Sequence, residues 1–399
     1  MLPFAEKNVL LGVCGSIAAY KACELASRLL EQGARVECAL TASAQRLVHA
    51  AALEAITGKR VITEMFPVAV NPEISHIAVA QRVDLCLVAP ATANILGKAA
   101  CGIADDWLST TLLALRAPLL FAPAMNTNMY THPATQANIA VLRERGAAIV
   151  GPASGRLACG TEGVGRLADI PDILDAAQIA VYPTKDYAGK RILITSGSNH
   201  EPIDPVRFIG NRSSGKMGRA LALEALCRGA EVCVISGPVT VAPPHGAKII
   251  PVNTADEMFT ATLGCMKNYD IIIGAAAVAD YKLESPETKK LKRGKGDLTL
   301  KLTPNQDIIA AVSNARKPGQ HVIGFAAESE EVLLRAEQKL QQKNLDMVIA
   351  NTIGGKDCAI GADQGDVCIL IPGKKAEKLE RIEKNQLARI IFDRLLELT

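Results

Sequence analysis

Short apolar segments alternate with helical segments along this chain, and the alternation runs twice. In the first half the apolar segments are residues 8–13, 35–40, 84–89, 118–122 and 147–150, and helical patterns such as 16–31 and 134–145 follow most of them. This alternation predicts βαβ units and therefore a parallel sheet. Aromatic residues make up only 4% of the chain, so small aliphatic residues must fill the core, as is typical of parallel strands covered on both faces.

A break near residues 181–189 separates the two rounds of alternation. A new strand is predicted at 190–195 and a helix at 215–228, and further strands are predicted at 231–235, 270–275, 321–325 and 346–350. We therefore expect two tandem doubly wound α/β domains, residues 1–188 and 189–399. The glycine-rich segment 151–166 before the break is interpreted as an irregular loop that is either a functional lid or disordered.

Composition excludes several classes of partner. The net charge is +3, and no basic run with interleaved aromatic residues indicates nucleic-acid binding. Eleven cysteines without a CxxC pair favour a reducing compartment. The apolar run at residues 9–14 is too short for a secretion signal, and no stretch is long enough to span a bilayer. We expect a cytoplasmic protein without a membrane partner.

Small and polar residues follow the predicted strands of the first domain. Gly12-Val-Cys-Gly-Ser-Ile-Ala-Ala-Tyr-Lys21 combines a strand, a glycine turn and a serine at a helix start, which favours a phosphate site. The loop lacks GxGxxG spacing and a ribose-binding acid, so a mononucleotide such as FMN fits better than NAD. Helix capping alone remains the alternative for this loop and for Asn126. The candidate cofactor-binding residues are Gly15, Ser16, Thr41, Pro90, Ala91, Thr92 and Asn94.

In the second domain, Asn211-Arg-Ser-Ser-Gly-Lys-Met-Gly218 opens a helix with small residues that expose N–H groups to an anion. The run does not match the Walker A spacing. Downstream, a carboxylate, Asp280, ends a buried strand, and Lys339 and Lys343 share one helical face. Lysines near acidic groups suggest a triphosphate with its metal, whereas the basic run 289–293 also fits a solvated surface loop.

The first-domain motifs resemble those of the flavin-dependent cysteine decarboxylases. His76 matches the active-site histidine of that family, Pro123-Ala-Met-Asn-Thr-Asn-Met-Tyr130 its substrate-recognition motif, and Ala158-Cys-Gly160 its mobile flap. The resemblance implies a flavodoxin-like flavoprotein domain in which FMN oxidises a substrate thiol before CO2 leaves. It also implies that Asn126 holds the substrate carboxylate or its amide, that His76 acts as a base, and that Cys159 is an acid. Tyr130 stands where the family often has tryptophan, and Thr92 where many members have serine.

The second domain resembles phosphopantothenate–cysteine ligase, and the whole chain resembles the bifunctional coenzyme A biosynthesis family. The resemblance implies a Rossmann-like ligase domain that uses CTP and Mg²⁺ to join 4'-phosphopantothenate to cysteine through an acyl-cytidylate. Asn211 would hold that intermediate, Lys290 (or its neighbour Lys289) would stabilise phosphate charge, and Asp280 would hold the metal. Ser198-Asn-His200 replaces the family's usual Pro-Thr-Arg. The implied CTP-binding residues are Ala275, Asp280, Lys290, Asn305, Gln306, Asp307, Ile308, Phe325, Lys339 and Lys343.

The family resemblance also bears on assembly and on the alternatives. It implies a homo-oligomer, trimeric or dodecameric through the flavin domain and dimeric through the ligase domain. A two-domain NAD-dependent reductase is the first alternative, disfavoured by the missing fingerprint glycines and acid. A flavin-binding regulatory subunit is the second, disfavoured by the presence of His76, Asn126 and Cys159 together. Sequence alone does not separate CTP from ATP, because both carry the same triphosphate.

Overall fold

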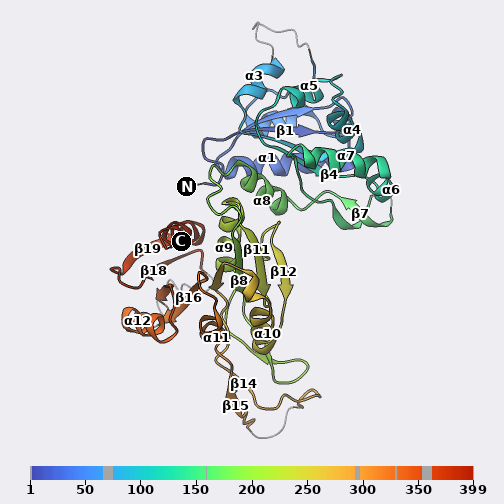
Figure 1. Cartoon of the computed structure of the whole chain (residues 1–399). Coiled ribbons are helices and arrows are strands. Elements are labelled where there is room, and N and C mark those ends of the chain that lie inside the picture. The colour runs from blue at the N-terminus through green and yellow to red at the C-terminus, as the bar shows by residue number, and fades with distance from the viewer. Residues whose placement is uncertain are drawn as a thin grey trace. The chain divides into compact units, whose positions relative to one another are not determined.

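The computed structural model describes residues 2–65, 75–158, 160–292, 297–328, 330–352 and 362–398. The chain divides into two compact units, Met1–Pro183 and Thr184–Thr399 (Figure 1). The predicted boundary between residues 188 and 189 therefore lies inside the second unit.

The first unit is built on a five-stranded parallel sheet in the order β2-β1-β3-β4-β5. This is the strand order of flavodoxin, whose switch point lies between β1 and β3. The strands are β1 (Asn8–Val13), β2 (Arg35–Leu40), β3 (Leu85–Ala91), β4 (Leu119–Pro123) and β5 (Ala148–Ile149). The helices are η1 (Ile17–Tyr20), α1 (Lys21–Glu31), η2 (Ala44–Arg46), α2 (Ala50–Thr57), α3 (Ser75–Arg82), α4 (Ala93–Cys101), α5 (Trp107–Ala114), α6 (Thr127–Thr131), α7 (Pro133–Glu144) and α8 (Ile170–Val181).

Helices cover both faces of this sheet because alternate strand residues point to opposite sides. In β1, Val9 and Leu11 pack with the buried residues of α1, α2 and α8. Leu10 faces the other way and packs with α3, α4, α5 and α7. The sheet is thus buried on both faces, as the low aromatic and high aliphatic content predicted.

Two local expectations for the first unit need correction. The predicted helix 16–31 begins with a separate 3-10 turn, η1, which Ser16 caps, and α1 starts only at Lys21. The glycine-rich segment predicted as an irregular loop forms an antiparallel hairpin of β6 (Ala153–Arg156) and β7 (Glu162–Arg166). Its glycines allow close contact: a Cβ at Gly165 would lie 2.2 Å from the Met125 carbonyl oxygen, and the Gly165 carbonyl accepts the Met125 N–H at 2.9 Å.

The second unit contains an eight-stranded sheet in the order β12-β11-β8-β13-β16-β17-β18-β19. The first six strands are parallel and follow the Rossmann order 3-2-1-4-5-6. β18 and β19 are antiparallel additions that no predicted strand covers. The strands are β8 (Arg191–Ser196), β11 (Glu231–Ser236), β12 (Lys248–Pro251), β13 (Ile271–Gly274), β16 (His321–Glu328), β17 (Met347–Thr352), β18 (Gln364–Leu370) and β19 (Glu377–Glu383).

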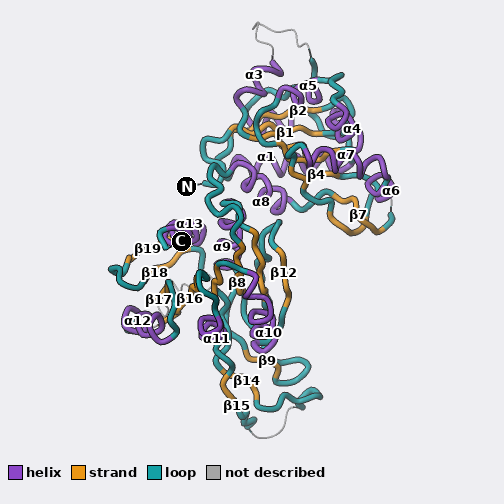
Figure 2. The backbone as a smooth tube through the Cα atoms, in the orientation of Figure 1, coloured by secondary structure: helices purple, strands orange, loops and turns teal. Residues whose placement is uncertain are grey.

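Helices again pack on both faces of this sheet (Figure 2). On one side lie α9 (Lys216–Cys227) and α13 (Lys384–Leu396); on the other lie α10 (Ala255–Cys265), α11 (Ile308–Ala315) and α12 (Val332–Gln342). Two small antiparallel pairs accompany the sheet: β9 (Glu201–Pro202) with β10 (Phe208–Ile209), and β14 (Tyr281–Leu283) with β15 (Leu302–Pro304). A 3-10 turn, η3 (Met266–Asn268), follows α10. Within the residues described, no helix is long and apolar enough to cross a bilayer.

Candidate active sites

A cavity of about 520 Å³ opens in the first unit at the carboxyl ends of the strands. It lies at the switch point of the sheet, where open α/β folds bind ligands. Its walls come from the loop after β1, the start of α4, the segment around Asn126, and the β6–β7 hairpin. Of the predicted cofactor-binding residues, Gly15, Ser16 and Thr92 line it.

The loop after β1 presents bare backbone to this cavity. A Cβ at Gly15 would lie 2.4 Å from the Ser43 Cβ, so the neighbouring loop leaves no room for a side chain. The Ser16 hydroxyl accepts the Ala18 N–H at 3.4 Å, and Thr92 caps α4 by accepting the Ile95 N–H at 3.4 Å. Backbone and hydroxyl groups at two helix starts fit the phosphate end of a flavin mononucleotide.

The other predicted cofactor residues lie behind or outside the cavity lining. Pro90 and Ala91 are buried, and the Pro90 carbonyl accepts the Cys14 N–H at 3.2 Å, which ties the loops after β1 and β3 together. The Thr41 hydroxyl accepts the Ala44 N–H at 3.3 Å, a local turn contact. Asn94 is exposed on α4. Neither Thr41 nor Asn94 lines the cavity.

Asn126 lies in the cavity wall between two methionines, Met125 and Met129, that also line it. Its Oδ1 accepts the Asn128 N–H at 2.8 Å and caps α6, so the helix-capping interpretation holds for the oxygen of this amide. The two donors of the amide are on Nδ2. Beside it, Thr127 Oγ1 is buried without a hydrogen-bond partner among the described residues.

The structure does not bring the predicted base into this cavity. His76 lies in the first turn of α3, is half-buried, and is not among the lining residues. The helix that carries it packs against α5 instead. Cys159 lies outside the described residues, although its neighbours Leu157 and Ala158 line the cavity.

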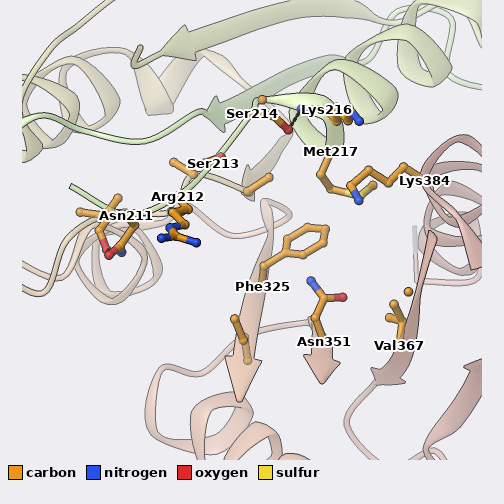
Figure 3. A pocket seen from close by; sticks show the side chains of 18 of the residues that line it. Asn211, Arg212, Ser213, Ser214, Lys216, Met217, Phe325, Asn351, Val367 and Lys384 are labelled. Carbon is orange, nitrogen blue, oxygen red and sulfur yellow. Dashed lines mark hydrogen bonds between the residues drawn. The ribbon is translucent and has the colours of Figure 1, made fainter. Parts of the chain in front are cut away.

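A second cavity, of about 680 Å³, lies in the second unit at the carboxyl ends of β13, β16 and β17 (Figure 3). Five predicted residues line it together although they are distant in sequence: Asn211, Ala275, Asp280, Phe325 and Lys339. The Asn211 Nδ2 donates to the Val278 carbonyl at 2.8 Å, which fixes the orientation of the amide.

Lys339 is a cation of this cavity with a perturbed pKa. Its Nζ donates to the Phe325 carbonyl at 2.6 Å. Burial lowers the pKa of Lys339, and the neighbouring charge of Lys343 lowers it further. A desolvated ammonium in a cavity is suited to bind an anion, because an anion would compensate the cost of burying the charge.

The predicted segment 305–308 lies beside Asp280 and outside the lining. Asn305 donates its backbone N–H to the Asp280 carbonyl and its Nδ2 to the Ala279 carbonyl, both at 2.8 Å, while its Oδ1 is buried without a partner among the described residues. Asp307 caps α11 and pairs with Lys343 at 2.5 Å. Although burial opposes it, the Lys343 hydrogen bond lowers the pKa of Asp307. Ile308 is buried in the hydrophobic core. Gln306 and Lys290 are exposed, and neither lines the cavity.

Several lining residues were not predicted as site residues. Lys384 and Asn351 come from the end of the sheet that carries the unpredicted antiparallel strands. Arg212 and Lys216 also line the cavity, and both lie in the predicted helix-opening motif. The local signal that could have found Lys384 is a lysine at the first position of a helix, where a cation is unfavourable.

The acidic side chains that line the second cavity suit a metal ion that binds together with a phosphate-bearing substrate. Among the described residues, no group of three or more His, Cys, Asp or Glu side chains could hold a metal ion. Asp280 and Glu328 are the carboxylates in the cavity lining. Mg²⁺ is commonly held by one or two carboxylates together with substrate phosphates, so these residues fit a metal bound with a triphosphate.

The two sheets and their strand-end cavities define a two-domain α/β enzyme whose first domain is of the flavoprotein class. Residues 4–181 match the family model described as "Flavoprotein", and residues 187–398 match "DNA/pantothenate metabolism flavoprotein C-terminal domain". The chain belongs to the family of the coenzyme A biosynthesis bifunctional proteins CoaBC.

Two relatives cover nearly the whole chain. The CoaBC protein of Mycobacterium bovis is 41% identical, over 98% of this chain and 96% of its own. That of Bacillus subtilis is 42% identical, over 99% and 98%. The solved C-terminal domain of a CoaBC protein aligns at 34% identity with a TM-score of 0.47, over 54% of this chain and 98% of that chain.

Proposed function

We propose that the chain makes 4'-phosphopantetheine in two steps. The second unit joins cysteine to 4'-phosphopantothenate with CTP, and the first unit decarboxylates the resulting 4'-phosphopantothenoylcysteine with FMN. The observation that carries the proposal is that each unit has its own strand-end cavity, lined by residues of its own motif. Family membership supports both halves of the assignment.

In the ligase cavity, the substrate carboxylate must attack the α-phosphate of CTP. The Asn211 amide, oriented by Val278, would hold the acyl-cytidylate that forms. Lys339 would bind a negatively charged part of CTP, and Asp280 would hold Mg²⁺ against the phosphates. Asn305 and Asp307 support the wall next to Asp280, and Lys290 would reach the site from its exposed loop.

In the decarboxylase cavity, bound FMN would supply the two-electron oxidation of the substrate thiol. Gly15, Ser16 and Thr92 would hold its phosphate and ring edge. The Asn126 amide would orient the cysteine carboxylate, and Met125 and Met129 would exclude water. Cys159 is assigned as the acid that returns a proton to the product.

His76 requires a second copy of the chain in this proposal. Because it lies outside the cavity of its own unit, it would act as base in the cavity of a neighbouring copy. A homo-oligomer is therefore part of the proposed function, trimeric or dodecameric through the first unit and dimeric through the second. We place the protein in the cytoplasm.

The test is incubation of the purified protein with 4'-phosphopantothenate, cysteine, Mg²⁺ and CTP, followed by mass spectrometry. We expect 4'-phosphopantetheine together with CMP and pyrophosphate. Accumulation of 4'-phosphopantothenoylcysteine would contradict the decarboxylase half. Product formed with ATP and not with CTP would contradict the nucleotide assignment.

A further inference from the structure

A buried carboxylate that the proposed mechanism does not use lies in the turn between β9 and β10. The side chain of Asp204 is 0% exposed, although aspartate side chains are seldom fully buried unless they are paired. Its Oδ1 accepts the backbone N–H groups of Val206 and Arg207, both at 2.8 Å. This oxygen closes the turn from which the chain continues through β10 to Asn211, which lines the ligase cavity.

The other oxygen of Asp204 reaches a segment 87 positions further along the chain. Asp204 Oδ2 accepts the backbone N–H of Leu291 at 3.1 Å. Leu291 directly follows Lys290, in the connection between β14 and β15. Because the N–H of Leu291 belongs to the planar peptide unit that it shares with Lys290, this hydrogen bond also fixes the backbone of Lys290.

Further contacts hold the same connection against the same turn. The Glu287 N–H donates to the Ile203 carbonyl at 2.9 Å, and the Arg207 Nη2 donates to the Leu291 carbonyl at 3.0 Å. In addition, β9 contacts β14 (Figure 2). The contact made by Asp204 differs from these because its acceptor is a buried carboxylate. Hydrogen bonds to a charged acceptor are stronger than those between neutral groups, and a buried carboxylate that loses a donor is costly.

We propose that Asp204 is a positioning residue of the ligase, which holds the backbone of Lys290 at a fixed place beside the segment that leads to Asn211. The inference rests on the proposed ligase function, in which Lys290 stabilises phosphate charge. The side chain of Lys290 is exposed and has no hydrogen-bond or ion-pair partner among the described residues. The position of its backbone therefore determines the region that its ammonium group can reach, and a small misplacement of such a group is costly for the rate.

The first test is Asp204→Asn in the full-length protein. Asparagine keeps one oxygen for the turn, but its NH2 group cannot accept the Leu291 N–H. We expect the kcat of CMP release to fall by about 10- to 100-fold, the loss typical of a hydrogen bond to a charged group. In a Lys290→Gln background the same substitution should have no further effect, because Asp204 acts through Lys290. Losses that multiply in the double variant would overturn the proposal, since a purely structural role of Asp204 does not depend on Lys290.

A second measurement does not need ligase turnover. Trypsin cleaves after lysine, and the Lys290–Leu291 bond carries the N–H that Asp204 binds. We expect trypsin to cut this bond about 10- to 100-fold faster in Asp204→Asn, because cleavage follows the population of the released segment. Asp270→Asn is the matched control: Asp270 Oδ2 also accepts a backbone N–H, that of Arg191 at 2.8 Å, and Asp270 does not line the cavity. This control should keep the wild-type kcat and cleavage rate.

Equal cleavage rates in the wild type and Asp204→Asn would overturn the proposal. If the wild-type protein shows no ligase turnover, the proposed function fails, and the cleavage rates alone then support or overturn the contact between Asp204 and the Lys290 backbone. If circular dichroism shows that Asp204→Asn is unfolded, Asp204→Ser replaces it in both measurements, because its single oxygen can still accept within the turn. Loss of the fold in both variants would also overturn the proposal, since Asp204 would then serve folding and not Lys290.

Discussion

Asn211 is the residue whose substitution should separate the two activities. Replacing it with aspartate keeps the shape, removes the N–H donors and places a negative charge against an anionic intermediate. We expect Asn211→Asp to lower the kcat of CMP release by about 100-fold or more, the range for loss of one such donor. Decarboxylation of supplied 4'-phosphopantothenoylcysteine should be unchanged.

The control for this variant is Asn268→Asp, which makes the same chemical change in η3, away from the cavity lining. Equal losses of CMP release in the two variants would show that the effect is general electrostatics and would contradict the role of Asn211.

Lys339 should give the ligase a distinctive pH dependence. Its pKa is lowered from 10.5 by burial and by Lys343, so its ammonium is present below that lowered pKa and lost as the pH rises through it. We expect the KM for CTP to rise with pH, and to do so at a lower pH than the one at which an ordinary lysine loses its proton. In Lys339→Arg the rise should move to higher pH, because guanidinium keeps its proton. Identical KM–pH profiles for the two proteins would exclude Lys339 as the titrating group.

At the scale of elements, the central strands could be predicted from sequence and the edge of the second sheet could not. β1, in the interior of the first sheet, has the mostly apolar sequence NVLLGV, and its predicted bounds are confirmed by the structure. β19 has the sequence EKLERIE, in which only Ile382 is buried, so it has no apolar run to indicate a strand. Lys384 follows β19 directly, and its place in the cavity depends on that unpredicted pairing with β18.

A buried arginine, Arg228, anchors the first residues of the second unit to α13. The side chain of Arg228 is 5% exposed; its guanidinium contacts Asp186 at 2.5 Å and Asp393 at 2.7 Å, and lies 5.0 Å from the centroid of the Tyr187 ring. We expect Arg228→Ala to lower the free energy of unfolding of this unit by about 3 kcal/mol, because the substitution leaves partly buried carboxylates without their cationic partner. Urea denaturation followed by circular dichroism measures the change.

Arg191→Ala is the comparison for that measurement, since Arg191 makes an exposed ion pair with Asp270 and should cost about 1 kcal/mol or less. Hydrogen bonds from Arg228 lower the pKa of Asp186 below 3.8. The stabilisation is therefore complete at neutral pH and is lost as the pH falls through that lowered pKa. Equal destabilisation by the two variants at pH 7 would contradict the anchor.

At the scale of the whole molecule, the order of the strands in a sheet decides which of the predicted site residues lie in one cavity, and therefore which of these groupings could be predicted. Gly15, Thr92 and Asn126 meet because parallel strands end at one edge of a sheet, a consequence that sequence periodicity can predict. His76 follows no strand end. It lies on a helix that packs against α5, and no pattern in one chain indicates where a second copy would place it.

Mixed oligomers test whether His76 acts in the cavity of another copy. His76→Asn and Asn126→Asp should each abolish decarboxylation when alone, because each removes one half of every site. If the two proteins are unfolded and refolded together in equal amounts, about a quarter of the sites should combine an intact Asn126 from one copy with an intact His76 from its neighbour, given random assembly of a ring with one such contact per cavity. We therefore expect about a quarter of the wild-type rate from the mixture. The control mixes His76→Asn with a His76→Asn, Asn126→Asp double variant, which contains no intact histidine and should stay inactive. A refolded His76→Asn and Asn126→Asp mixture that is fully oligomeric and still inactive would show that the histidine does not act between copies.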